Sequence, residues 1–122
     1  MGLELAVHSV RCEAIPHSAG QEARETLAAW LTDLAELLVA RGCRFIGHIK
    51  GMAVAAGEEP LFFSLTRPRA EPQFKGGGWD KAESWELSVS VILAGLSEEE
   101  IGQAMQETLK THFKIFSGEA KA

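Results

Sequence analysis

Strict alternation of hydrophobic and polar residues marks the clearest element of this chain, a strand from Trp85 to Gly95. Side chains of a strand point alternately to its two faces, so a period of two predicts one covered face and one open face. The expected inner positions are Leu87, Val89, Val91 and Leu93, and the expected outer positions include Ser88 and Ser90. We therefore expect this strand to cover a core with one face only.

The stretch from Gly42 to Thr66 has the same period and predicts a β-hairpin. Its two strands are separated by residues 57–60, Gly-Glu-Glu-Pro, which favour a tight turn. The apolar set is expected to face the core: Phe45, Gly47, Ile49, Gly51 and Ala53, then Leu61, Phe63 and Leu65. The mixed set is expected outside: Ile46, His48, Lys50, Met52 and Val54, then Phe62, Ser64 and Thr66.

Residues 3–15 predict a further strand, which ends at Pro16 because proline cannot donate a hydrogen bond to a neighbouring strand. Its register stays open. Leu3, Leu5 and Val7 share one face, and Ala6, His8, Val10 and Cys12 share the other. Apolar residues occur on both faces, so either both are partly covered or a β-bulge exchanges them.

Two segments show the three- and four-residue spacing of amphipathic helices. The first follows Ser18 and Gln21, which have the form of a capping box, and it runs to about Arg41, where Gly42 ends it. Its apolar stripe is Leu27, Trp30, Leu31, Leu34, Leu37 and Leu38. The second begins at Ser97, which three glutamates follow. Its apolar stripe is Ile101, Ala104, Met105, Leu109 and Phe113.

The segment from Arg67 to Ser84 lacks periodicity and contains three consecutive glycines at positions 76–78. A stretch of about 18 residues is longer than most loops without secondary structure, and such loops are often functional or mobile. Phe74 and Trp79 flank the glycines. Two interpretations follow: these aromatic side chains close over a ligand, or they anchor the loop to the body of the protein.

Together these elements predict an α+β fold, a two-layer α/β sandwich in the order βαβββα. A four-stranded mixed sheet would carry both helices on one face. A helix joins the first strand to the strand beginning at Arg44, so these two strands should be parallel. We expect a single domain over residues 1–116 and a frayed tail over residues 117–122, which have nothing to bury.

Composition narrows the class of protein. The 122 residues are 46% hydrophobic, enough for one core, and no apolar run approaches the roughly 20 residues of a membrane span. A net charge of −5 argues against nucleic acid as the main partner, because binding phosphates requires a basic face. The first residues lack the pattern of a signal peptide, so we expect a cytoplasmic protein without a membrane partner.

Imidazole, ammonium and hydroxyl groups gather on the predicted outer face. The residues that carry them are His48, Lys50, Ser64, Thr66, Ser88 and Ser90. Such a surface suits anion binding or acid–base chemistry. A solvated sheet face has the same composition, which is the alternative interpretation.

His8, Cys12 and His48 are the candidates for a metal site. His8 and Cys12 lie four residues apart on one predicted strand and so share a face, and nitrogen and thiolate donors hold zinc or another transition metal. The alternative is that Cys12 is a small core residue and His8 a half-buried strand residue, since the CxxC and HxxxH spacings are absent. The sequence therefore assigns no cofactor.

Large apolar residues on the predicted outer face suggest that something covers it. They are Ile46, Met52, Val54, Phe62, Trp85 and Ile92. A second copy of the chain would bury them, so we expect a homodimer that uses this face or a sheet edge. An error in the assumed register would remove the reason for this expectation.

Three segments resemble the carboxy-terminal region of some CobW-like GTP-binding proteins. They are RFIGHIKGMAV from Arg44, PLFFSLT from Pro60 and LSVSVILAGLSEEEIGQAM from Leu87. The residues that carry across are Gly47, His48, Ile49 and Lys50. This chain has neither the P-loop nor the clustered-cysteine motif by which that family handles GTP and metal ions. The resemblance therefore implies the accessory domain alone.

Two functions fit these observations. The first is a non-catalytic binding or assembly module, as an accessory to a metal- or cofactor-handling GTPase. The second is a small cofactor-independent enzyme in which His48 is the general base and Lys50 stabilises charge. A concave pocket that contains both side chains would favour the enzyme.

Overall fold

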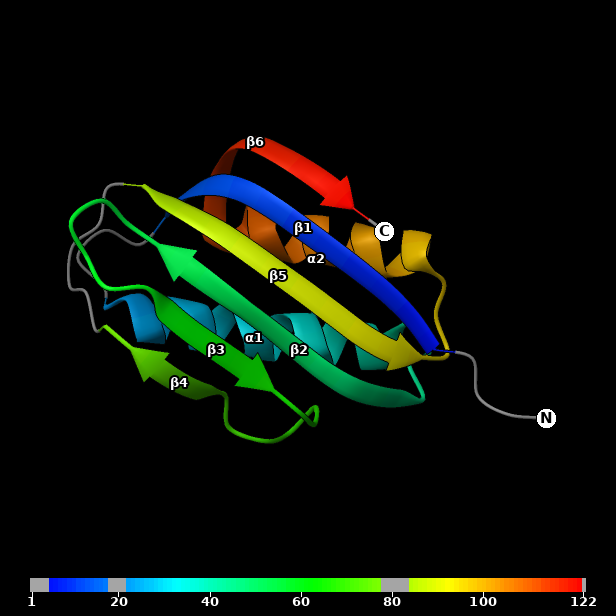
Figure 1. Ribbon diagram of the computed structural model, residues 1–122. Helices are drawn as coiled ribbons and strands as arrows, with labels where there is room; N and C mark the ends of the chain where they lie inside the picture. The colour runs from blue at the N-terminus through cyan, green and yellow to red at the C-terminus, as the bar shows by residue number, and fades with distance from the viewer. Residues whose placement is uncertain (1–4, 18–21, 78–83, 122) are drawn as a thin grey trace.

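The computed structural model describes residues 5–17, 22–77 and 84–121, without the side chains of Phe45 and of residues 117–121. Within these residues two helices and six strands form two layers, with both helices behind the sheet (Figure 1). In chain order the elements are β1 (Leu5–Pro16), α1 (Ala23–Ala40), β2 (Phe45–Val54), β3 (Leu61–Leu65), β4 (Gln73–Gly76), β5 (Trp85–Ala94), α2 (Glu98–His112) and β6 (Phe113–Lys121).

The sheet has the order β4-β3-β2-β5-β1-β6, and every neighbouring pair is antiparallel. β5 lies between β1 and β2, which therefore run in the same direction without pairing. Such a split βαβ unit, with β6 beyond β1, gives the strand order of the ferredoxin-like β-α-β-β-α-β arrangement. β3 and β4 extend that sheet on the side of β2.

The α+β class and the placement of both helices on one face agree with the sequence prediction, but the four-stranded mixed sheet was wrong. β4 lies inside the segment predicted to be a loop, where Phe74 pairs with Phe63 and the carbonyl of Gly76 accepts a 2.8 Å hydrogen bond from Arg24 of α1. Glycine and proline around this short strand conceal its period. Residues 78–83, with Trp79, lie outside the described residues.

The sixth strand replaces the predicted end of the second helix. α2 stops at His112, and Phe113 has an extended backbone with φ −138° and ψ 152°. Its side chain is buried and packs edge-on against Trp85, with ring centroids 5.3 Å apart. Phe113 therefore belongs to the core as predicted, but from a strand. Residues 117–121, predicted to fray, continue β6 and pair with β1.

Both predicted helix signals that lie within the described residues are present. The hydroxyl of Ser97 accepts a 3.1 Å hydrogen bond from the backbone N–H of Glu100, whose carboxylate accepts a 2.9 Å bond from the N–H of Ser97. Hydrogen bonding of the Glu100 carboxylate to Ser97, first of all to its backbone N–H, lowers the pKa of Glu100, because it stabilises the ionised form. Gly42 has the left-handed φ of +112° expected after α1. Ser18 and Gln21 lie outside the described residues.

The inner and outer faces of β3 and β5 follow the alternation of the sequence, but two predicted outer residues do not. Ile46 is 4% exposed and Trp85 is 2% exposed, and both face the helices. A β-bulge between Ile46 and His48 changes the face of β2 at that point. Trp85 lies two residues before the buried Leu87 and therefore on the same face of β5, so the prediction assigned Trp85 to the wrong face.

β1 resolves the register that the sequence left open. Cys12 and Ala14 are buried, whereas Leu5 and Val7 are exposed. The set that contains His8 and Cys12 therefore faces the helices, and the opposite set faces away from them. His8 lies beside Gly102 of α2, where the absence of a side chain leaves room for the imidazole ring.

An aromatic cluster around Trp30 joins the two layers. The indole N–H of Trp30 in α1 donates a 3.0 Å hydrogen bond to the buried hydroxyl of Thr108 in α2. The Trp30 ring also meets Phe63 of β3 and Phe113 of β6 edge-on, at centroid distances of 6.2 Å and 6.5 Å. One side chain thus fixes both helices and two strands relative to one another.

Thr108→Val should destabilise the protein by about 1–3 kcal/mol, because it leaves the buried indole N–H of Trp30 without its acceptor. Thr111→Val is the matched control. The hydroxyl of Thr111 also donates to a carbonyl four residues back, at 3.0 Å, but it is exposed. We expect the control to stay within about 0.5 kcal/mol of the parent chain in urea unfolding. Equal effects of the two substitutions would contradict a special role for the Trp30–Thr108 bond.

Candidate functional site

The sheet face opposite the helices, called the open face, arranges its side chains in rows across the strands. The first row, called the polar row, consists of Ser9, Ser90, Lys50, Ser64 and Gln73 from β1, β5, β2, β3 and β4. The adjacent row, called the mixed row, consists of Arg11, Ser88, Met52, Phe62 and Lys75 from the same five strands. Strand register alone therefore gathers ten side chains from distant parts of the chain.

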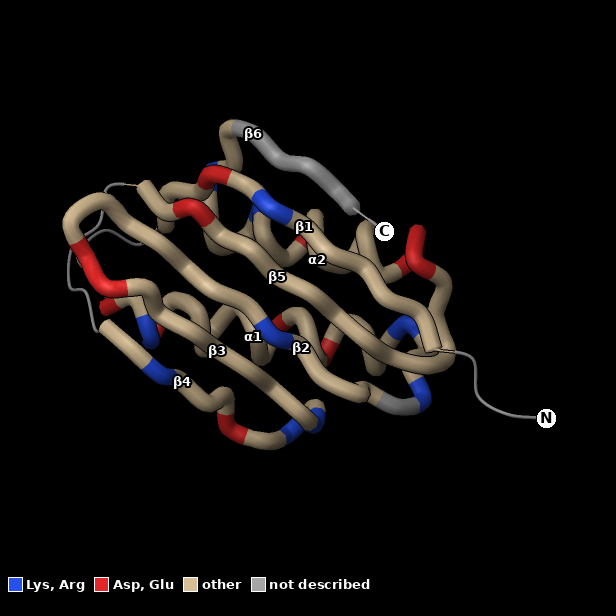
Figure 2. The backbone as a smooth tube through the Cα atoms, viewed as in Figure 1, with Lys and Arg blue, Asp and Glu red and all other residues tan. Residues whose placement is uncertain are grey.

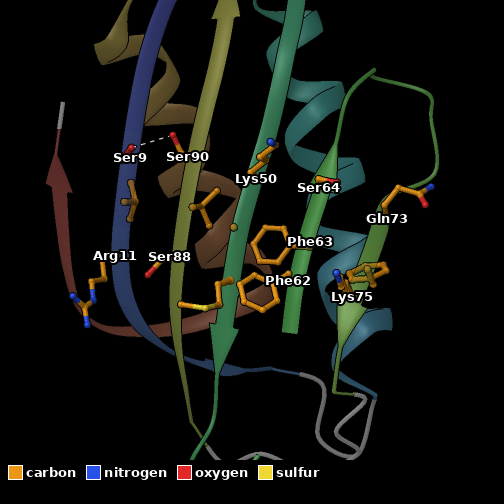
Figure 3. A pocket seen from close by; sticks show the side chains of 15 residues that line it. Ser9, Arg11, Lys50, Phe62, Phe63, Ser64, Gln73, Lys75, Ser88 and Ser90 are labelled. Carbon is orange, nitrogen blue, oxygen red and sulfur yellow. Dashed lines mark hydrogen bonds between the residues drawn. The ribbon is translucent and has the colours of Figure 1, made fainter. Parts of the chain in front are cut away.

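Both rows line a groove of about 620 Å³ in the open face (Figure 3). Its depth has a simple origin in residue size. The small side chains of Ser88 and Ser90 occupy the central strand β5, whereas the longer Met52 and Arg11 stand on its two neighbours. The middle of the face is consequently lower than its sides.

The polar row centres on Lys50. In the register of the sheet this exposed side chain lies between Ser90 on β5 and Ser64 on β3 (Figure 3). The hydroxyl of Ser9 donates a 3.1 Å hydrogen bond to the hydroxyl of Ser90. An ammonium group thus stands in a line of hydroxyls that are already partly ordered.

The mixed row has an apolar centre and basic ends. Phe62 remains 49% exposed although it lies in the middle of a strand, and Met52 is its cross-strand neighbour. Arg11 at one end pairs with Glu86, whose Oε1 accepts a 2.6 Å hydrogen bond from the arginine Nε. Lys75 at the other end is the neighbour of Phe62 on β4.

The groove carries positive charge in a chain whose net charge is −5. Its charged lining residues in the described part of the chain are Arg11, Lys50 and Lys75, without a carboxylate among them. Figure 2 shows these basic positions on β1, β2 and β4. Glu86 offsets the charge of Arg11, whereas neither lysine makes an ion pair with any carboxylate that the structure describes. The local field therefore favours an anion.

The structure brings together several of the residues that the sequence singled out. Lys50 lines the groove with four of its predicted companions: Ser64, Phe74, Ser88 and Ser90. Thr66 lies just beyond β3, outside the groove lining. His48 is on the open face opposite Ile92, one row away from Lys50, and does not line the groove. Trp79 lies outside the described residues.

Sequence reasoning missed part of the groove. Ser9 and Arg11 were not identified because the register of β1 was open, and their place depends on pairing with a strand about 80 residues later. Gln73 and Lys75 were not identified because β4 was taken for a loop. The alternation of Gln73, Phe74 and Lys75 is a signal that could have revealed this strand.

The three metal candidates do not meet. His8 and Cys12 line a second cavity, of about 500 Å³, between β1 and α2, whereas His48 lies on the opposite face of the sheet. Across the described ranges no three His, Cys, Asp or Glu side chains are placed to share a metal ion. Burial raises the pKa of the Cys12 thiol and so disfavours the thiolate that a metal would need.

Comparison with protein-family models, with curated proteins and with solved structures gave no match. The resemblance to CobW-like proteins therefore stays a prediction. Neither helix of the described chain is long and apolar enough to span a membrane.

Cys12 should resist alkylation by iodoacetamide in the folded protein, because burial both shields the sulfur and keeps it protonated. Cys43, which is only partly buried, is the internal control. We expect Cys12 to react at least about tenfold more slowly than Cys43, as measured by peptide mass spectrometry over time, and both to react rapidly in denaturant. Equal rates in the folded state would show that the second cavity admits reagents to Cys12.

Proposed function

We propose that this protein is a non-catalytic binding module that holds a small ligand with an apolar body in the groove of the open face. The observation that carries the proposal is the half-exposed Phe62 beside Met52, which together line one side of a concave surface with polar and basic borders. A volume of about 620 Å³ lies within the usual range of small-molecule sites, which are mainly apolar with a few polar groups that fix orientation.

A ligand that covers Phe62 gains a measurable free energy of binding. Complete burial of a phenylalanine side chain is worth about 1.5–3 kcal/mol, and roughly half of this remains available at 49% exposure. Met52 and the apolar parts of the lysine side chains add further area. A ligand that covers these groups therefore gains at least about 1 kcal/mol from this row alone.

The position of His48 supports binding rather than catalysis. An enzyme based on His48 and Lys50 requires both side chains beside one substrate. Lys50 lines the groove, but His48 belongs to the next row and stands opposite Ile92, outside the lining. The groove thus offers charge and hydroxyl groups without the proposed general base.

The predicted cytoplasmic location and the CobW-like setting are compatible with such a module, which would present its ligand to a GTPase partner. The predicted homodimer competes for the same surface. Its motivation is weaker than the sequence suggested, because Ile46 and Trp85 face the helices, although Met52, Val54, Phe62 and Ile92 remain outside. We take a small ligand as the occupant of the groove.

The neutral dye N-phenyl-1-naphthylamine, which brightens in apolar surroundings, tests the proposal by titration with the protein. Phe62→Asp should weaken dye binding about fivefold or more, because it removes about 1 kcal/mol of apolar contact. Val39→Asp is the matched control, since Val39 is 47% exposed on α1, away from the groove. His48→Ala is a second control on the open face itself, and neither control should change the affinity.

Equal dye affinities for the Phe62 and Val39 variants, with unchanged circular dichroism, would exclude the groove as the binding site. Sedimentation at micromolar concentration tests the other possible occupant of the groove, a second copy of the chain. A dimer that Phe62→Asp dissociates would show that a second copy covers the open face, and it would overturn the ligand proposal.

A further inference from the structure

The geometry of the polar row points to the chemical class of the ligand. We infer that the groove binds an amphipathic carboxylate, with the carboxylate at Lys50 and the apolar body over Met52 and Phe62. The inference rests on the proposed function and deepens it, because it assigns the head group and the orientation of the ligand.

Lys50 is the cation best placed to hold a single negative charge. β2 lies inside the sheet, with β5 on one side and β3 on the other. Neighbouring strands are about 4.8 Å apart, so the hydroxyls of Ser90 and Ser64 stand within reach of an anion that contacts the Lys50 ammonium. One ammonium group between two hydroxyl donors suits a carboxylate, whose single negative charge is shared by two acceptor oxygens.

The Ser9–Ser90 hydrogen bond prepares one of these donors. The Ser90 oxygen accepts a 3.1 Å hydrogen bond from the Ser9 hydroxyl, which leaves the O–H of Ser90 able to donate to another acceptor. Hydrogen bonds in such a chain polarise one another, which strengthens the donor. The acceptor that suits the end of this series of hydrogen bonds, beside the Lys50 ammonium group, is an anionic oxygen.

The other two cations of the groove are less suited to the head group. Arg11 already pairs with Glu86, so much of its charge is offset. Lys75 stands on β4 at the edge of the sheet, and its neighbour across the strands is the Phe62 ring rather than a hydroxyl. Lys75 therefore borders the apolar part of the ligand.

The direction of the apolar body follows from the next residues of β2. Met52 is two residues beyond Lys50 on the same face, about 6.8 Å along the strand, and Phe62 is the cross-strand neighbour of Met52. In the opposite direction His48 and Ile92 lie outside the groove lining. The body of the ligand consequently covers the mixed row.

Displacement of N-phenyl-1-naphthylamine by four compounds with the same ten-carbon chain tests the head group. The compounds are decanoate, decan-1-ol, decylammonium and decyl phosphate, each used below its micelle concentration. We expect decanoate to displace the dye at a concentration about three- to tenfold lower than decanol, from one charge-assisted contact at a partly exposed site. Decylammonium should be the weakest.

Lys50→Gln should abolish the difference between decanoate and decanol, because it removes the charge that only decanoate contacts. Lys50→Arg should restore part of the difference, because it returns the charge. Lys75→Gln is the matched control on the same groove and should preserve the difference.

Each other outcome overturns the inference. Equal binding of decanoate and decanol, a preference that survives Lys50→Gln, a loss of preference with Lys75→Gln alone, or stronger binding of decyl phosphate would each exclude the assigned carboxylate site. These results leave the groove itself intact, since the dye still binds and still responds to Phe62→Asp. Only failure of the neutral dye test removes the proposed function.

Discussion

The alternation along β5 is the constraint on which the rest of the structure depends. Its leucines and valines fill the space between the sheet and both helices, and its serines leave the opposite face low in the middle. Because β1 and β2 both pair with this strand, the same register that buries Leu87 and Val91 also sets Ser90 beside Ser9 and Lys50. The core and the groove are two faces of one periodic pattern.

The aromatic cluster on the other side of the sheet supports the strands of the open face. Trp30 contacts Phe63 from α1, and Phe63 is the residue that follows Phe62 on β3. A Cβ at Gly51 would collide with the Phe63 ring, so the glycine makes room for the ring beside β2. A helix residue thus holds in place the strand whose opposite side presents Phe62 to the groove.

Much of this arrangement can be predicted from the sequence, because strong local patterns specify it. The period of two assigned the faces of β3 and β5, and the spacing of Ser97 and Glu100 located the start of α2. The errors arose where pairing between distant segments of the chain determines the structure. The glycines and prolines around β4 obscure its short alternation. β6 exists because it pairs with β1, and the bulge at Gly47 reverses the face of Ile46. Lys50 and its serines were found from the sequence, whereas Ser9 and Lys75 depended on strand order.

The central position of β5 also has a kinetic consequence. The strand that joins the two halves of the sheet is made late, and its pairs with β1 link residues as far apart as Leu5 and Ala94. Closing so long a chain segment costs entropy before any contact repays it, so we expect this topology to fold more slowly than one built from local contacts. During synthesis, β1, α1 and β2 leave the ribosome before β5 and wait without their shared neighbour. Their apolar surfaces stay accessible to chaperones until Ala94 emerges.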